Sequence, residues 1–277
     1  MNEPAFVEIA DRIYLLRHPV LDVNVTLVVG PGAALMVDTL STPAQAASLV
    51  AAARRVTSQP WAVVNTHHHF DHSFGNAVVA GSPPCPIWAH DAAAARLVAG
   101  PAVVAAAAAW ATRTDRRLAA EIAVVTVLPP SRLVQTESTL DVGGRPVVLR
   151  HFGRAHTDGD LVVHVPDVDL IVAGDIVEES GPPSFDDSYP LEWPETLAGM
   201  LRTMTPETVV IPGHGVPVGH GFVTGQHQEL AALEWLIRDA HGDGAPQSAA
   251  AAHAPFGPQA AKAAIARGYA ELSGAVT

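Results

Sequence analysis

The stretch Thr66-His67-His68-His69-Phe70-Asp71-His72-Ser73-Phe74-Gly75-Asn76 decides how the chain is interpreted. Four of its side chains, His67, His69, Asp71 and His72, can each offer a lone pair to a metal ion. The stretch follows the apolar run at residues 61–64, which predicts a strand, and loops at strand ends commonly carry chemical function. Imidazole and carboxylate ligands together suit zinc, with manganese or iron as substitutes. We therefore predict a metal site in this loop.

Three later segments offer ligands of the same kind. His156 lies in a turn at residues 154–160, between two predicted strands. Asp175 ends the apolar run at residues 170–174, where an unpaired buried charge would be costly. His214 follows another predicted strand, and the glycines on either side of it let its backbone approach a ligand closely. With the first cluster, these residues predict a shell of seven ligands around two metal ions.

The order of the predicted elements favours an α/β (α+β) fold, a four-layer αββα sandwich in which two sheets pack face to face under helices. Strands are expected at residues 6–9, 13–17, 23–29, 34–37, 61–64, 140–142, 147–151, 161–165, 170–172 and 209–211. Helices are expected at residues 43–56, 90–98, 101–118, 194–204, 222–241 and 257–272. We predict a single domain over residues 1–277, with residues 222–277 as its helical C-terminal region.

Composition limits the partners. The chain has 28 acidic and 16 basic residues, and the bases are scattered, so we expect no nucleic acid partner. The single cysteine, Cys85, excludes an internal disulfide framework. The apolar stretch at residues 101–110 is too short to span a bilayer, and the first residues do not resemble a secretory signal, so we expect a cytoplasmic protein with no membrane partner. Whether the tail covers the fold or forms a homodimer is left open.

The chain resembles the metallo-β-lactamase superfamily from the strand that ends at Asp38 to His214, in the order of all its ligand segments. The resemblance implies the αββα sandwich and the following assignment: His67, His69 and His156 hold one metal, Asp71, His72 and His214 hold the other, and Asp175 bridges them. The bridging aspartate is more similar to the glyoxalase II, lactonase and thioesterase branches than to true β-lactamases.

Two departures put the branch in doubt. The lactonase branch is expected to place a tyrosine shortly after the bridging aspartate, and this chain has Glu178. Glyoxalase II enzymes hold glutathione with basic residues, whereas the one lysine here is Lys262. Side chains that could orient the metal-binding imidazoles are Asp38, Thr66, Thr157 and Asp160.

The predicted chemistry is hydrolysis. Two divalent cations, zinc before manganese or iron, can share a hydroxide that attacks an ester, thioester, lactone or amide of a small organic substrate. Asp71 is the expected catalytic residue, because its carboxylate can orient the attacking oxygen or relay its proton. The expected substrate contacts are Arg154, Phe185, Tyr189 and Trp193. The alternatives are a mononuclear iron dioxygenase of the persulfide dioxygenase type and a metal-binding protein without turnover.

Overall fold

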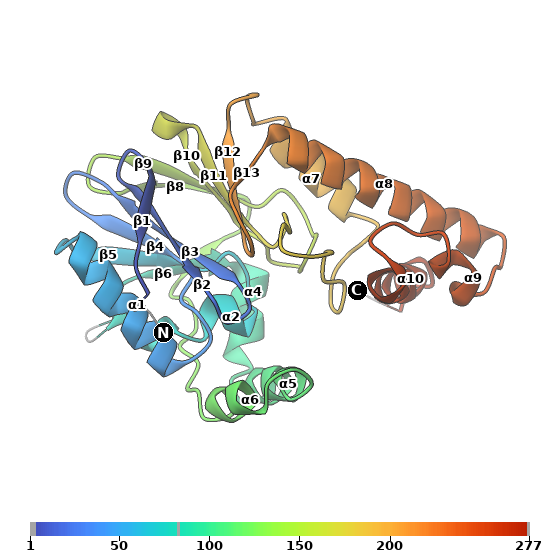
Figure 1. Ribbon diagram of the computed structural model, residues 1–277, viewed down its shortest axis with the longest axis horizontal. Helices are drawn as coiled ribbons and strands as arrows, with labels where there is room; N and C mark the ends of the chain where they lie inside the picture. Colours follow the sequence, from blue (N-terminus) through green and yellow to red (C-terminus); the bar gives the residue numbers. More distant parts are fainter. Residues whose placement is uncertain (1–3, 82–83, 276–277) are drawn as a thin grey trace.

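The computed structural model describes residues 4–81 and 84–275, whose strands form two sheets (Figure 1). The first sheet contains, in spatial order, β1 (Val7–Ala10), β2 (Ile13–His18), β3 (Val23–Val29), β4 (Ala34–Val37), β5 (Trp61–Val64), β6 (Ile87–His90) and β7 (Arg132–Val134). The second contains β13 (Val218–Gly219), β12 (Val209–Pro212), β11 (Leu170–Gly174), β10 (Val162–Val165), β9 (Pro146–Arg150) and β8 (Glu137–Asp141).

The two sheets face each other across one apolar core. Successive side chains of a strand point to opposite faces, and β4 shows the consequence. Leu35 and Val37 pack between the sheets, whereas Ala34 and Met36 pack on the outer face of the first sheet. The second sheet contributes Leu149, Val163 and Val172, among others, to the shared core.

Helices cover both outer faces, which gives the four predicted layers. On the first sheet lie α1 (Pro43–Val56) and α3 (Asn76–Ala80); α2 (Phe70–Ser73), α4 (Asp91–Val98), α5 (Pro101–Ala111) and α6 (Arg116–Ile122) follow in the same half of the chain. On the second sheet lie α7 (Trp193–Leu201) and α8 (His220–Gly242), and α9 (Gln247–Ala251) and α10 (Pro258–Leu272) pack against α8. The predicted αββα sandwich is confirmed.

The helix expected over residues 101–118 is two helices. The first ends at Ala111, and Asp115 begins the second by accepting hydrogen bonds from the backbone N–H groups of Arg117 and Leu118. An aspartate in this capping position satisfies backbone donors that the first turn of a helix leaves free. Among the described residues, no single helix is both long and apolar enough to cross a bilayer; only α4 and α5 together, bent by 90°, pass by length and composition.

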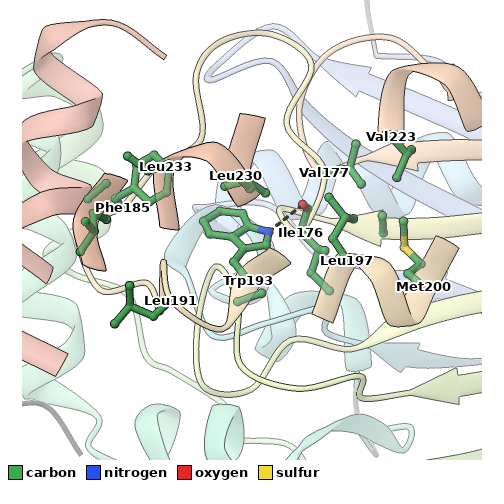
Figure 2. Close-up of a cluster of buried hydrophobic side chains, with 14 of the residues drawn as sticks. Ile176, Val177, Phe185, Leu191, Trp193, Leu197, Met200, Val223, Leu230 and Leu233 are labelled. Atoms are coloured by element: carbon green, nitrogen blue, oxygen red, sulfur yellow. Dashed lines mark hydrogen bonds between the residues drawn. The ribbon is translucent and has the colours of Figure 1, made fainter. Parts of the chain in front are cut away.

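Trp193 lies at the centre of the core beneath the C-terminal helices (Figure 2). Its side chain is fully buried, and its indole Nε1–H donates a hydrogen bond to the backbone oxygen of Ile176, 3.1 Å away. Leu230 and Leu233 of α8 pack in the same core as Ile171 of the second sheet. The C-terminal helices thus share a core with the sandwich; one domain over residues 1–277 stays a prediction.

Replacing Trp193 by alanine will lower the free energy of unfolding by about 3–5 kcal/mol, because the change leaves a cavity and removes one of the two hydrogen bonds that the Ile176 carbonyl accepts. Urea denaturation followed by circular dichroism measures the loss. Trp235 of α8 is 66% exposed, so Trp235→Ala is the matched control and should change stability by no more than about 0.5 kcal/mol. Equal effects of the two substitutions would contradict the packing described here.

Candidate metal centre

Strand ends from both sheets bring the predicted ligands together. His67 to His72 follow β5, whereas Asp175 and His214 follow β11 and β12, which are parallel neighbours whose carboxyl ends meet. His156 precedes β10, which runs antiparallel to β11, so it enters at the same edge. Val23 of the first sheet forms a β-bridge with His214, which joins the two halves at the site. All seven predicted ligands therefore converge.

One group of ligand atoms consists of His67, His69, His156 and Asp175, and all lie within 4.8 Å of one another. Nδ1 of His69 is 3.0 Å from Nε2 of His67 and 2.9 Å from Nε2 of His156. Oδ2 of Asp175 is 3.4 Å from Nε2 of His156. Ligands about 2.0–2.1 Å from one tetrahedral zinc ion lie roughly 3.3–3.4 Å apart, so these spacings suit a shared cation.

A second group consists of Asp71, His72 and His214. Nε2 of His214 is 3.3 Å from Nε2 of His72 and 3.6 Å from Oδ2 of Asp71. Asp175 belongs to this side too, because its Oδ2 lies 3.3 Å from Nε2 of His214 and its Oδ1 lies 3.2 Å from Nε2 of His72. One carboxylate thus touches both groups, as the bridging role expected for Asp175 requires.

The donor set fits divalent cations. Imidazole nitrogens that face each other at about 3 Å cannot both be lone-pair acceptors unless a proton or a cation lies between them. Asp175 is buried, and no donor in residues 4–81 and 84–275 is aligned to hydrogen-bond to its Oδ1. A buried carboxylate is costly unless charge compensates it, and five imidazoles with two carboxylates form a ligand set that zinc, manganese or iron accepts.

In His67, His72 and His214, the ring nitrogen that faces away from the cluster is held by another group, whereas Nδ1 of His156 has no hydrogen-bond partner among the described residues. Nδ1 of His72 lies 2.8 Å from Oδ2 of Asp38, and Nδ1 of His67 lies 3.0 Å from Oγ1 of Thr66, which itself donates to Asp38. Nδ1 of His214 lies 2.7 Å from the backbone oxygen of Leu21. Partners of this kind fix the tautomer of a metal-binding histidine and direct its other nitrogen at the metal. Asp38 supports one imidazole in each group.

The two other residues that could orient an imidazole, Thr157 and Asp160, hydrogen-bond to each other instead of to a ring. Asp160 accepts hydrogen bonds from the backbone N–H and the hydroxyl of Thr157, at 2.9 and 2.7 Å. This pairing holds the turn that presents His156 without touching its ring. Burial dominates the pKa of Asp160 and raises it to about 7.

Burial and neighbouring charges shift the pKa values of the histidines in opposite directions. Burial lowers the pKa of His156 to about 4 and that of His67 well below its usual value, so both rings are neutral near neutral pH. Burial also opposes protonation of His69 and His72, but Asp187 raises the pKa of His69 to about 9, and Asp175 raises that of His72 to about 9. Without a cation, the latter two rings are protonated at neutral pH.

Asp187, which the sequence analysis did not identify, pairs with the imidazole of His69. Its carboxylate oxygens lie 3.1 and 3.2 Å from Nε2 of His69, on the far side of the ring from the cluster, and 3.4 Å from Nε2 of His68. Arg267 of α10 donates to the backbone oxygens of Asp187 and Ser188. The surrounding histidines, His69 first, keep the pKa of Asp187 far below its usual value although burial opposes this.

Glu178 also belongs to the site. Its carboxylate lies within 4.8 Å of ligand atoms of Asp175 and His214, and its side chain borders the cavity beside them. Its backbone N–H donates to Oε1 of Gln226 in α8, 3.0 Å away. The sequence identified this position only as a departure from the lactonase pattern.

A cavity of about 420 Å³ opens beside the ligands, and the four predicted substrate contacts do not line it. Phe185 and Trp193 are buried in the core under the C-terminal helices. Arg154 pairs with Glu192, and its guanidinium lies 4.3 Å from the centre of the ring of Tyr189, which is also buried. The segment that was expected to form a pocket wall does border the cavity, through residues such as Ser180, Pro182 and Ser184, but its aromatic side chains pack inward, where they bury apolar surface.

The fold and the ligand cluster define a metal-binding protein of the αββα class. The chain belongs to the metallo-beta-lactamase superfamily, whose family model matches residues 18–214. A metallo-beta-lactamase type 2 from Bacillus sp. (strain 170) is 28% identical over 85 residues, which are 30% of this chain and 33% of that protein. The matched segment thus spans about a third of the length of this curated relative.

Solved structures show the same fold at low sequence identity. A metallo-beta-lactamase from Pontibacter korlensis covers 82% of this chain and 99% of its own, with a TM-score of 0.64 at 17% identity. The metallo-beta-lactamase FIM-1 from Pseudomonas aeruginosa, in a mono-zinc form, covers 84% and 97%, with a TM-score of 0.64 at 17% identity. The inverting sec-alkylsulfatase Pisa1 from Pseudomonas sp. covers 97% and 50%, with a TM-score of 0.77 at 15% identity.

Asp187→Ala will weaken zinc binding about tenfold, because His69 loses the acceptor that fixes its tautomer. Competition against a chromogenic chelator measures the affinity, and the fold should remain intact by circular dichroism. The neighbouring Asp186 forms an ion pair with Arg113 and belongs to none of the groups of possible metal ligands found in the described residues, so Asp186→Ala is the matched control and should bind zinc as tightly as the parent. Unchanged affinity in Asp187→Ala would refute this role.

Metal binding should release protons. Burial opposes protonation of His214 too, but Asp175 raises its pKa well above the usual value, so cations must displace protons from His69, His72 and His214. About three protons therefore leave near neutral pH, and the apparent affinity rises with pH up to about 9. Isothermal titration calorimetry in buffers of different ionisation enthalpy measures this release. An affinity independent of pH between neutrality and pH 9 would contradict the charge state described above.

Proposed function

We propose that the protein is a hydrolase that uses two divalent cations, zinc first, to cleave an ester, thioester, lactone or amide of a small organic substrate. Membership of the metallo-beta-lactamase superfamily supports a metal-dependent hydrolase fold. The observation that carries the finer proposal is Asp175, whose carboxylate touches both groups of ligand atoms. A shared carboxylate is what a pair of cations a few ångströms apart requires.

The chain's own residues supply binding and proton transfer. His67, His69 and His156 would hold one cation, and Asp71, His72 and His214 would hold the other. Bound there, the cations supply a water molecule of lowered pKa and a Lewis acid for the carbonyl oxygen. Asp71 borders the cavity, so its carboxylate can orient the attacking water and accept its proton.

The alternatives have less support. A mononuclear iron dioxygenase needs one ligand group, and the second group, Asp71, His72 and His214, has no purpose in it. Sulfate-ester hydrolysis, suggested by the alkylsulfatase Pisa1, calls for cationic partners, and no lysine or arginine is among the described residues that line the cavity. A protein without turnover would not need ligand groups that open into a cavity of substrate size.

The direct experiment screens zinc-, manganese- and iron-loaded protein against esters, thioesters, lactones, amides and an alkyl sulfate. We expect hydrolysis of at least one acyl compound, which chelation abolishes and added zinc restores. Hydrolysis that survives complete metal removal, or turnover of the sulfate ester alone, would overturn the proposal.

Asp71→Asn will lower kcat by about 10²- to 10⁴-fold, since the amide can neither accept the proton nor bind the cation as a carboxylate does. Steady-state kinetics on the best acyl substrate measure the effect, and circular dichroism checks the fold. Asp243, at the exposed end of α8, provides the matched control Asp243→Asn, which should retain parental activity. Full activity in Asp71→Asn would refute the assigned role.

A further inference from the structure

One face of α5 forms part of the wall of the cavity. Val103, Ala106, Ala107 and Trp110 line it, at the spacing of residues on one side of a helix. The ring of Phe70 extends this wall, with its centre 5.5 Å from that of Trp110. The stripe from Val103 to Trp110 is about 10 Å long. The same cavity is bordered by His69 and Asp71, so the apolar wall begins at the metal centre.

The described lining of the cavity gives an anionic group no permanently charged cation as a partner. Glu178, Asp186 and Asp187 border it, and the described lining contains neither lysine nor arginine. Arg113 pairs with one of these carboxylates, Asp186, at 3.6 Å and lies 5.7 Å from the centre of the ring of Trp110. A substrate carboxylate here would meet carboxylates, which repel it.

We propose that the substrate is uncharged outside its scissile group and carries an apolar acyl or alkyl arm that lies along Val103, Ala106 and Trp110 of α5. The inference rests on the proposed function, since it places the scissile bond at the metal centre. Two observations carry it: one cavity is lined both by His69 and by Trp110, and the charged side chains on its lining, apart from histidines, are carboxylates. An arm of this kind buries apolar surface on the helix and avoids the carboxylates.

Three p-nitrophenyl esters with one leaving group test this arm: the acetate, the octanoate and the monoester of suberic acid, whose arm ends in a carboxylate. We expect kcat/KM to rise about two- to fourfold for each added methylene that is buried, so the octanoate should exceed the acetate by more than about tenfold. The suberate monoester should fall at least about tenfold below the octanoate. Equal rates for octanoate and acetate, or preference for the suberate monoester, would overturn the proposal.

A pair of alanines on α5 provides matched variants. Ala106 and Ala109 are both exposed on the same helix, but only Ala106 lines the cavity. Ala106→Asp should lower the octanoate-to-acetate ratio of kcat/KM by about tenfold, because it places a carboxylate in the apolar wall. Ala109→Asp should leave that ratio unchanged. Equal effects of the two variants would contradict the placement of the arm.

A binding measurement separates this inference from the proposed function. The uncharged fluorescent probe N-phenyl-1-naphthylamine should bind the zinc-loaded parent and Ala109→Asp equally, and Ala106→Asp about tenfold more weakly. If no ester is cleaved but the probe shows this pattern, the proposed function fails and the apolar arm site stands. If esters are cleaved without chain-length preference and the probe binds both variants alike, the arm site fails and the proposed function stands.

Discussion

The burial of Asp175 among imidazoles is the constraint on which the structure depends. Its carboxylate lies between two groups of histidines, 3.3 Å from His214 and 3.4 Å from His156. Burial alone would raise the pKa of Asp175, and the positive charge of His72 and His214 instead holds that pKa well below its usual value. The ligands come from both sheets, so they gather only when the sandwich closes. Cations that bind this closed arrangement stabilise it against unfolding.

The groups around the ligands connect the metal centre to distant parts of the chain. Asp38, at the end of β4, orients imidazoles in both groups through His72 and Thr66. Arg267 of α10 holds the backbone at Asp187, whose carboxylate holds His69. The C-terminal helices therefore support the candidate metal centre as well as the core. The link is the segment between β11 and α7, which contains Asp187.

The sequence predicted the sandwich and the cluster of seven candidate ligands because strand ends and ligand residue types are both local features. It also proposed Asp38 and Thr66, since both stand at strand ends beside the site. It could not find Asp187, which is one acid among several in a long connection and meets His69 only through the tertiary fold. The aromatics Phe185 and Trp193 were misplaced for the same reason: an apolar ring suits a pocket wall and a core equally, and only packing decides.

The central claim is that two cations share Asp175, and anomalous diffraction at the zinc absorption edge tests it most directly. Crystals of zinc-loaded protein should give two peaks roughly 3.5–4 Å apart. One should be bound by His67, His69 and His156, the other by Asp71, His72 and His214, with Asp175 between them. A single peak at saturating zinc, or a peak that excludes Asp175, would contradict the account.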